Sequence, residues 1–338
     1  KTKILSILLL TISLGVAAQK ISLGSCYTHD EGLYQGEMLA GKPHGKGNVK
    51  FANGDTYEGE YVKGKRQGFG VYQFVDGEKY EGQWFQDQQH GKGTYYFANN
   101  NRYEGLWFRD FQQGQGTMFY YNGDKYVGAW YEDKRQGRGR YTYANGAFYD
   151  GDWEADMKQG KGVFSWGDGT TYVGQWVANQ RSGKGVFTYA SGDSYNGMWK
   201  DDMQEGRGIY KFQNGDVYEG DFVDGRAEGH GVFTWADGSV YDGEWENNMR
   251  QGKGTMAWAN GDSFAGTWKN DLPEGMGEAV NADGTMYKGE FAEGLTHGEG
   301  TIHEGDGTTL HGSFSEGKRV GTFIIRDKDG NRIGTVNY

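Results

Sequence analysis

The sequence predicts an all-β fold, an elongated single-layer antiparallel sheet made of stacked β-hairpins. Three observations support this prediction. The 338 residues include 61 Gly but only 2 Pro, and a chain this rich in Gly favours many tight turns and closely packed backbones. Aromatic residues make up 16% of the chain, which argues against disorder. A short motif recurs every 23 residues, which is typical of stacked repeats that bury a continuous core together.

The repeat is easiest to follow from its first residue, which opens a Tyr-x-Gly tripeptide such as Tyr57-Glu58-Gly59. Thirteen copies follow one another without an insertion. Their first residues are Tyr34, Tyr57, Tyr80, Tyr103, Tyr126, Tyr149, Tyr172, Tyr195, Tyr218, Tyr241, Phe264, Tyr287 and Leu310.

The other positions of the repeat also recur. A large side chain such as Trp84 follows two residues after the Gly, a Gly-x-Gly such as Gly45-Lys46-Gly47 comes later, and a turn such as Asn53-Gly54-Asp55 closes the copy. This pattern resembles the MORN repeat family closely over about residues 32–330. The resemblance implies a scaffold that holds partners or associates with itself along the sheet, and some family members are linked to membranes. The departures are an Asn99-Asn100-Asn101 turn and, in the last copies, Asn281 and Glu304 in an otherwise aromatic row and Leu310 in place of Tyr.

Each repeat boundary is predicted to be a β-hairpin. Apolar and polar residues alternate over 57–61 and over 45–51, the period of strands with one buried face. A three-residue loop, Ala52 to Gly54, places Val49 opposite Tyr57 and Gly47 opposite Gly59, with Gly54 in the left-handed conformation. We expect each strand Gly to leave space in which a neighbouring aromatic ring lies against the backbone.

The two ends of the chain differ from the repeats. Residues 1–18 join a basic start to an apolar run and small residues before Gln19, the pattern of a secretory signal peptide. Residues 19–31 are predicted to be a flexible segment, and residues 331–338 a C-terminal strand or tail. The protein is therefore expected to be exported, to the periplasm or cell envelope of a bacterium or otherwise to the outside of the cell. Lipidation of Cys26 is a less favoured alternative, because Gln19 and Lys20 interrupt the apolar run.

Charge and cysteine content exclude several kinds of partner. The formal net charge is −11 and the pI is about 5.2, whereas nucleic-acid binding needs a basic surface. A single Cys excludes an intramolecular disulfide and a CxxC zinc or redox site.

No motif predicts catalysis, a cofactor, a metal site or a small-molecule substrate. Gly-x-Gly occurs in twelve copies, but none has the strand-then-helix context of a phosphate-binding loop. The seven His residues show no metal-ligand spacing. The segment 327–331 resembles part of a calcium loop but lacks the closing Glu.

One group of aromatic residues falls outside the repeat rows, all of it within residues 69–148. Alternation predicts that several of these rings point outward, and exposed apolar patches mark partner surfaces. The other interpretation is that loop packing covers the rings. The candidate interaction patch comprises Phe85, Tyr96, Phe108, Phe111, Phe119, Tyr121 and Tyr131.

The sequence thus predicts an exported, non-catalytic repeat scaffold at the cell envelope. Its partner would be another protein or a second copy of the chain, as in a homodimer. The alternative hypothesis is a peripheral module that binds phospholipid at a membrane surface.

Overall fold

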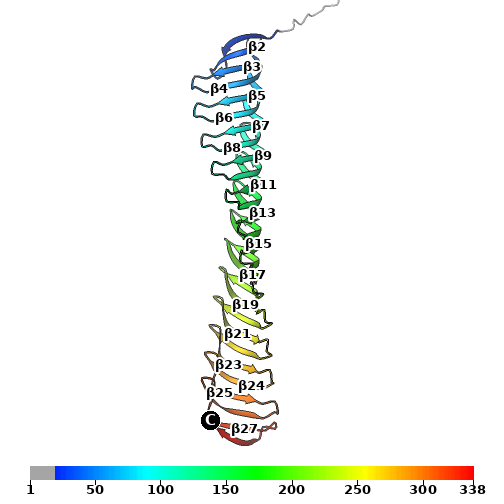
Figure 1. The fold of residues 1–338 in the computed structure, drawn as a ribbon, viewed down its shortest axis with the longest axis vertical. Coiled ribbons are helices and arrows are strands. Elements are labelled where there is room, and N and C mark those ends of the chain that lie inside the picture. Colours follow the sequence, from blue (N-terminus) through cyan, green and yellow to red (C-terminus); the bar gives the residue numbers. More distant parts are fainter. Residues whose placement is uncertain (1–19) are drawn as a thin grey trace, which may run out of the picture. The chain divides into compact units, whose positions relative to one another are not determined.

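The computed structural model describes residues 20–338, which contain β-strands and turns but no helix. The predicted signal peptide, residues 1–18, lies outside the described residues. Within them the chain divides into two compact units, unit 1 up to residue 134 and unit 2 from residue 135. In each unit every strand pairs in antiparallel fashion with the next strand in the chain, in a single layer (Figure 1). The predicted fold class is confirmed.

Unit 1 comprises the first ten strands. They are β1 (Ser22–Tyr27), β2 (Leu33–Leu39), β3 (Lys42–Lys50), β4 (Thr56–Val62), β5 (Lys65–Gln73), β6 (Lys79–Phe85), β7 (Gln88–Tyr96), β8 (Arg102–Phe108), β9 (Phe111–Phe119) and β10 (Lys125–Tyr131).

Unit 2 comprises the remaining eighteen strands. They are β11 (Lys134–Thr142), β12 (Phe148–Glu154), β13 (Met157–Ser165), β14 (Thr171–Val177), β15 (Gln180–Thr188), β16 (Ser194–Lys200), β17 (Met203–Lys211), β18 (Val217–Val223), β19 (Arg226–Thr234), β20 (Val240–Glu246), β21 (Met249–Ala257), β22 (Ser263–Lys269), β23 (Leu272–Val280), β24 (Met286–Ala292), β25 (Leu295–His303), β26 (Thr309–Ser315), β27 (Lys318–Arg326) and β28 (Arg332–Asn337).

The hairpin between copies has the predicted loop and register. Val49 lies opposite Tyr57 and Gly47 opposite Gly59. The Phe51 N–H donates to the Asp55 carbonyl (3.0 Å), which closes a three-residue loop over 52–54. Gly54 has a φ of 97°, so the left-handed position predicted for it is confirmed.

The hairpin inside each copy uses a different turn, which the sequence analysis did not identify. Between β6 and β7 two residues with positive φ, Gln86 (49°) and Asp87 (74°), form the turn, and this combination defines a type I′ turn. The position of Asp87 is held by Gly, Asp or Asn in all thirteen copies, a signal that could have revealed it. The Asp87 carboxylate also accepts a hydrogen bond from the Arg66 N–H (2.8 Å), which links consecutive copies.

The two glycines of Gly-x-Gly have separate physical reasons. The first, such as Gly160 with a φ of 64°, lies in a bulge where β13 has two residues more than β12. The second, Gly162, lies beneath the ring of Tyr149 together with Gly151. The expectation that every strand Gly makes room for a ring therefore holds for Gly151 and for the second Gly of Gly-x-Gly, but not for the first. The covering ring also comes from the same strand as Gly151, two residues earlier, and not from a neighbouring copy.

One face of each unit, here called the aromatic face, carries the core. The Tyr149 side chain is fully buried and packs edge-on against Trp153 (5.2 Å) and against Trp176 of the next copy (5.4 Å). Its hydroxyl donates to the Asp152 carbonyl (2.9 Å). Such T-shaped ring pairs are favoured beyond their burial, and the pattern recurs from copy to copy. The opposite face, which carries outward side chains such as Asp152, is called the polar face.

The thirteenth copy keeps this packing by an exchange of positions. Leu310 stands where other copies have Tyr, and Phe323 replaces the second Gly. The Phe323 ring is fully buried and lies over Gly312, in the space that a Tyr ring fills elsewhere. Phe323 packs edge-on against Phe314 (5.2 Å) and Tyr338 (5.2 Å).

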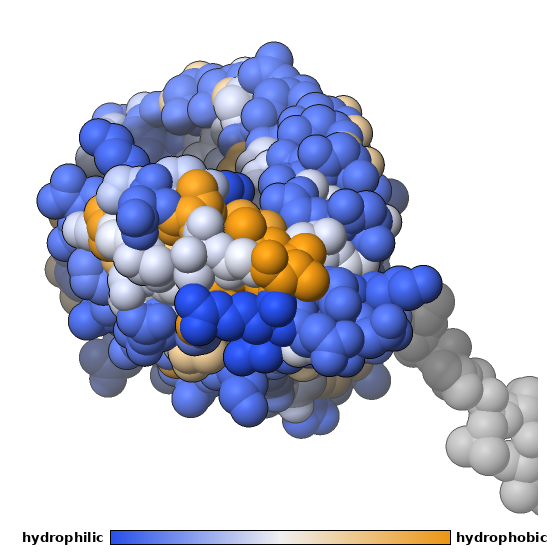
Figure 2. All heavy atoms as spheres, turned by 90° about the horizontal axis from the view of Figure 1, so that it is seen from below, coloured by the Kyte–Doolittle hydropathy of each residue, from blue (hydrophilic) through white to orange (hydrophobic). Residues whose placement is uncertain are grey.

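The ends of the described chain are strands. The predicted flexible segment 19–31 is corrected, because β1 in this segment pairs with β2 from Ser22 to Tyr27. Residues 331–338 contain β28, which pairs with β27. Figure 2 views this C-terminal end, where hydrophobic side chains gather among hydrophilic ones. Val320, Ile333 and Tyr338 are exposed there.

Candidate interaction surface

The candidate residues Phe85, Phe108, Phe111 and Tyr131 form one group at the type I′ turns of unit 1. Each ring is 46–53% exposed and lies on the polar face, because the neighbouring residue in its strand, such as Trp84 or Trp107, is buried on the aromatic face. Phe108 and Phe111 lie directly opposite each other on β8 and β9.

His90 belongs to this group but was not predicted. Its ring lies between those of Phe85 (5.5 Å) and Phe108 (5.3 Å). Eight of the other twelve copies have an amide or carboxylate at this position that accepts a hydrogen bond from the next turn, as Gln113 does from the Glu132 N–H (3.3 Å). His also holds this position at His44 and His297, and His44 Nδ1 accepts from the Lys63 N–H (3.5 Å). The signal available in the sequence was therefore a His together with Phe85 and Phe108.

The other three candidates lie at the opposite ends of the strands. Tyr96 is 36% exposed, with the Lys79 ammonium 4.2 Å from its ring centre. Phe119 is only half-buried, and the Arg102 guanidinium lies over its ring at 4.4 Å. Tyr121, in the loop after β9, is 76% exposed. The six candidates on strands therefore share the polar face, and with Tyr121 in its loop the candidates form two groups. A cation lies over the rings of both Tyr96 and Phe119, and Phe119 is the less exposed of these two.

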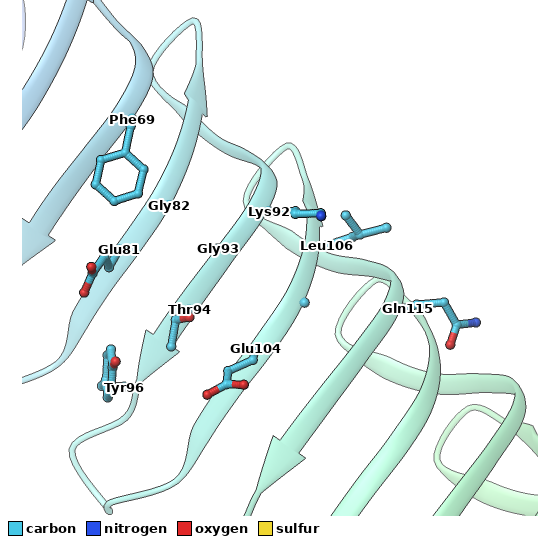
Figure 3. A pocket seen from close by; sticks show the side chains of 11 residues that line it. Phe69, Glu81, Gly82, Lys92, Gly93, Thr94, Tyr96, Glu104, Leu106 and Gln115 are labelled. Atoms are coloured by element: carbon cyan, nitrogen blue, oxygen red, sulfur yellow. The ribbon is translucent and has the colours of Figure 1, made fainter.

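A shallow hollow of about 590 Å³ lies between the two groups. Figure 3 shows Glu81, Thr94 and Glu104 side by side on β6, β7 and β8, with Phe69 and Tyr96 at the margin. Phe69 is 52% exposed. We use the term unit 1 patch for the exposed rings of this face and of the loop after β9, which are Phe69, Phe85, Tyr96, Phe108, Phe111, Tyr121 and Tyr131.

The polar face is poor in charge at the unit 1 patch. The outward positions of β8, β9 and β10 contain one carboxylate, Glu104, and the Arg102 guanidinium neutralises it at 2.8 Å. In unit 2 the charge differs between strands, since the outward positions of β12 contain Asp150, Asp152 and Glu154 whereas those of β14 contain no charged residue. Depletion of charge with retention of aromatic rings is the compositional signal of an interface core.

The described residues contain no group of three or more His, Cys, Asp or Glu placed to hold a metal ion. No helix among them is long and apolar enough to cross a membrane. The large pKa shifts belong to tyrosines of the aromatic face: burial raises the pKa of Tyr172 and that of Tyr241 to about 12. These groups serve the core.

The repeat decides the family. The MORN repeat profile matches twelve consecutive segments of 23 residues, from residue 34 to residue 309. The chain belongs to the MORN-repeat family. The thirteenth copy, which begins at Leu310, lies beyond the matched segments, although it continues the same MORN hairpin geometry in β26, β27 and β28.

No curated protein matches this MORN-repeat chain significantly. Solved structures that resemble it include the TCP10 domain of Danio rerio CPAP in complex with a STIL peptide, with 11% identity, a TM-score of 0.23, and coverage of 80% of this chain and 96% of that one. The Drosophila melanogaster SAS-4 TCP domain in complex with a proline-rich motif of Ana2 has 12% identity, a TM-score of 0.27, and coverage of 53% and 85%. At such TM-scores the likeness supports no conclusion about fold or function.

Proposed function

We propose that this MORN-repeat protein is an exported, non-catalytic scaffold that docks a protein partner, or a second copy of itself, on the unit 1 patch. The observation that carries the proposal is the set of half-exposed rings on a face whose equivalent positions in unit 2 contain no Phe, Tyr or Trp. Exposed aromatic rings cost solubility, and aromatic anchors supply most of the energy of protein interfaces.

The size of the unit 1 patch supports this proposal. Its seven rings are 36–76% exposed. At ~200 Å² per aromatic side chain they offer ~700 Å², close to the ~800 Å² that each partner contributes to a stable complex. The exposed Leu106 and Val127 on the same strands add apolar area.

Export rests on residues 1–18 alone, whose pattern is that of a signal peptide. Intact-mass measurement on natively expressed protein tests it, with Gln19 expected as the first residue. Lipidation at Cys26 would require cleavage inside β1, where Cys26 pairs with Tyr34, and this speaks against it. A mass that retains residues 1–18 would contradict export.

Affinity capture from cell-envelope extract tests the docking function. The patch variant F85T/F108T/F111T is compared with wild type and with V177T/K200T/M203T, which changes the same repeat positions four copies later. Wild type and control are expected to retain the same partner, or to form the same oligomer by light scattering, and the patch variant neither. Equal behaviour of all three proteins would contradict the proposal.

Vesicle sedimentation examines the phospholipid alternative. Arg102 at the unit 1 patch is paired with Glu104, and Lys79 with Glu81 (3.2 Å), which leaves little positive field for anionic lipid. We therefore expect no salt-sensitive binding to phosphatidylserine vesicles. Strong salt-sensitive binding that the patch variant loses would favour the membrane module instead.

A further inference from the structure

The aromatic face contains a row of cations. In five copies the charged group of an Arg or Lys lies over the Trp ring of the next copy. The distances from the charged group to the nearest Trp ring centre are 4.6 Å for Arg66 and Trp84, 4.2 Å for Arg135 and Trp153, 4.5 Å for Lys158 and Trp176, 4.4 Å for Arg181 and Trp199, and 4.5 Å for Arg250 and Trp268. Attraction between a cation and the face of a Trp ring is favourable, and it strengthens as water is excluded.

One copy of unit 2 lacks the side chain that would cover its Trp. Ala227 holds the equivalent position below Trp245, and its methyl group cannot reach across the ring. Trp245 is 9% exposed, against 2–6% for the other seven Trp residues of its row. A hollow of about 300 Å³ opens there, lined by Tyr218, Phe222, Phe233 and Trp245.

The polar groups around this hollow match those of a copy that holds a cation. The Asn248 side-chain oxygen accepts from the Ala227 N–H (2.7 Å). Asn179 accepts in the same way from the Lys158 N–H (2.8 Å), and in that copy the ammonium group of Lys158 lies over Trp176. An Asn at this turn is therefore compatible with a cation over the ring, and the net charge of −11 favours cations throughout.

We propose that the hollow over Trp245 binds an organic cation, a guanidinium or alkylammonium group, either as a small molecule or as an Arg or Lys side chain of a partner. The chain itself fills the equivalent space with a cation in five copies and with a Gln in three. The volume of the hollow matches the lower end of ligand sites, where a short side chain or a small cation fits. The site lies on the aromatic face of unit 2, so it is independent of the unit 1 patch.

Titration followed by the indole N–H signals of the folded protein tests this proposal. The probes are propylguanidinium, its neutral analogue propylurea, and the peptide acetyl-Gly-Arg-Gly-amide with a citrulline peptide as its neutral match. The neutral probes are needed because Gln holds the cation position in three other copies. The Trp245 signal, assigned through W245F, should shift saturably with the cations and at least tenfold more weakly with the neutral analogues.

The two cationic probes identify the source of the ligand. A response to the Arg peptide alone indicates a side chain of a partner, and a response to propylguanidinium indicates a small molecule. The variant A227R/N248D rebuilds the Arg250 and Asp271 arrangement (3.1 Å) and should weaken binding at least tenfold while it remains folded. R250A should open a second site, reported by Trp268. No shift at Trp245, an equal response to neutral probes, undiminished binding in A227R/N248D, or a folded R250A without a second site would each overturn the proposal.

Discussion

The thirteenth copy and the copy that contains Ala227 both depart from the repeat on the aromatic face, with opposite results. In the thirteenth copy a ring is lost at Leu310, and Phe323 supplies another in the same space, fully buried over Gly312. In the other copy a long side chain is lost at Ala227, and a hollow of about 300 Å³ remains.

The difference between a refilled space and an open one distinguishes a change that preserves packing from a change that creates a binding site. Interiors pack densely, and an unfilled space costs stability, so a loss that is refilled serves the fold. A loss that stays open needs another explanation, and a ligand is one. The unit 1 patch differs from both copies, because there the chain gains aromatic rings on the polar face instead of losing a side chain on the aromatic face. These additional rings fill no interior space.

The strongest test of this comparison concerns Phe323. F323G should destabilise by about 3–5 kcal/mol, the cost of removing a buried Phe ring, because Leu310 is too short to fill the space. L310Y alone should also destabilise, because Phe323 already occupies the place of the Tyr ring. The double variant L310Y/F323G restores a regular copy and should recover most of the loss in chemical denaturation. A double variant no more stable than F323G would contradict the exchange.

A regular copy should tolerate no side chain beneath its Tyr ring. A methyl group on Gly151 would lie 2.6 Å from the Cα of Gly162 and 2.6 Å from Cζ of Tyr149. G151V should therefore lower the free energy of unfolding by about 3 kcal/mol, the upper end of overpacking costs. The control D150V changes the adjacent outward residue and should cost well under half as much. Equal unfolding midpoints for the two variants would refute the close packing of ring and glycine.

Alkaline pH should weaken the aromatic face. Burial raises the pKa of Tyr172 to about 12, above its usual value near 10, so the folded state holds the proton longer than the unfolded state. This contribution is complete below about pH 10 and is lost as pH rises toward 12. The urea midpoint should be lower at about pH 11 than at about pH 8. The decrease should be slightly smaller in Y172F, a substitution that another copy already contains at Phe264. A midpoint that rises with pH would have the wrong sign.

Much of the fold was predictable because the 23-residue period fixes which residues face each other. The register of Val49 with Tyr57 followed from the loop length, and it is confirmed. The type I′ turn was missed although Gly, Asp or Asn at the position of Asp87 in every copy signals it. The exchange of Leu310 and Phe323 was missed because it depends on two neighbouring strands. When each repeat position is compared on its own, Leu310 and Phe323 look like two unrelated departures from the repeat.

The candidate surface was less predictable. Alternation placed Phe85 and Phe108 correctly on the polar face, because a strand has a period of two. It could not show that Arg102 covers Phe119 at 4.4 Å, nor that His90 joins the group, since both depend on side chains of neighbouring strands. The hollow over Trp245 was missed because Ala227 is unremarkable until the cations of the other copies are seen over their Trp rings.

The central claim is that the rings of the unit 1 patch contribute little to the stability of the fold. The free energy of unfolding of F85T/F108T/F111T tests this claim most directly. Exposed substitutions usually change stability by no more than about 0.5 kcal/mol each, and Thr suits a strand. The patch variant should therefore unfold within about 1.5 kcal/mol of wild type, as should V177T/K200T/M203T. A loss of several kcal/mol in the patch variant alone would show that the rings pack the fold, and it would contradict the account.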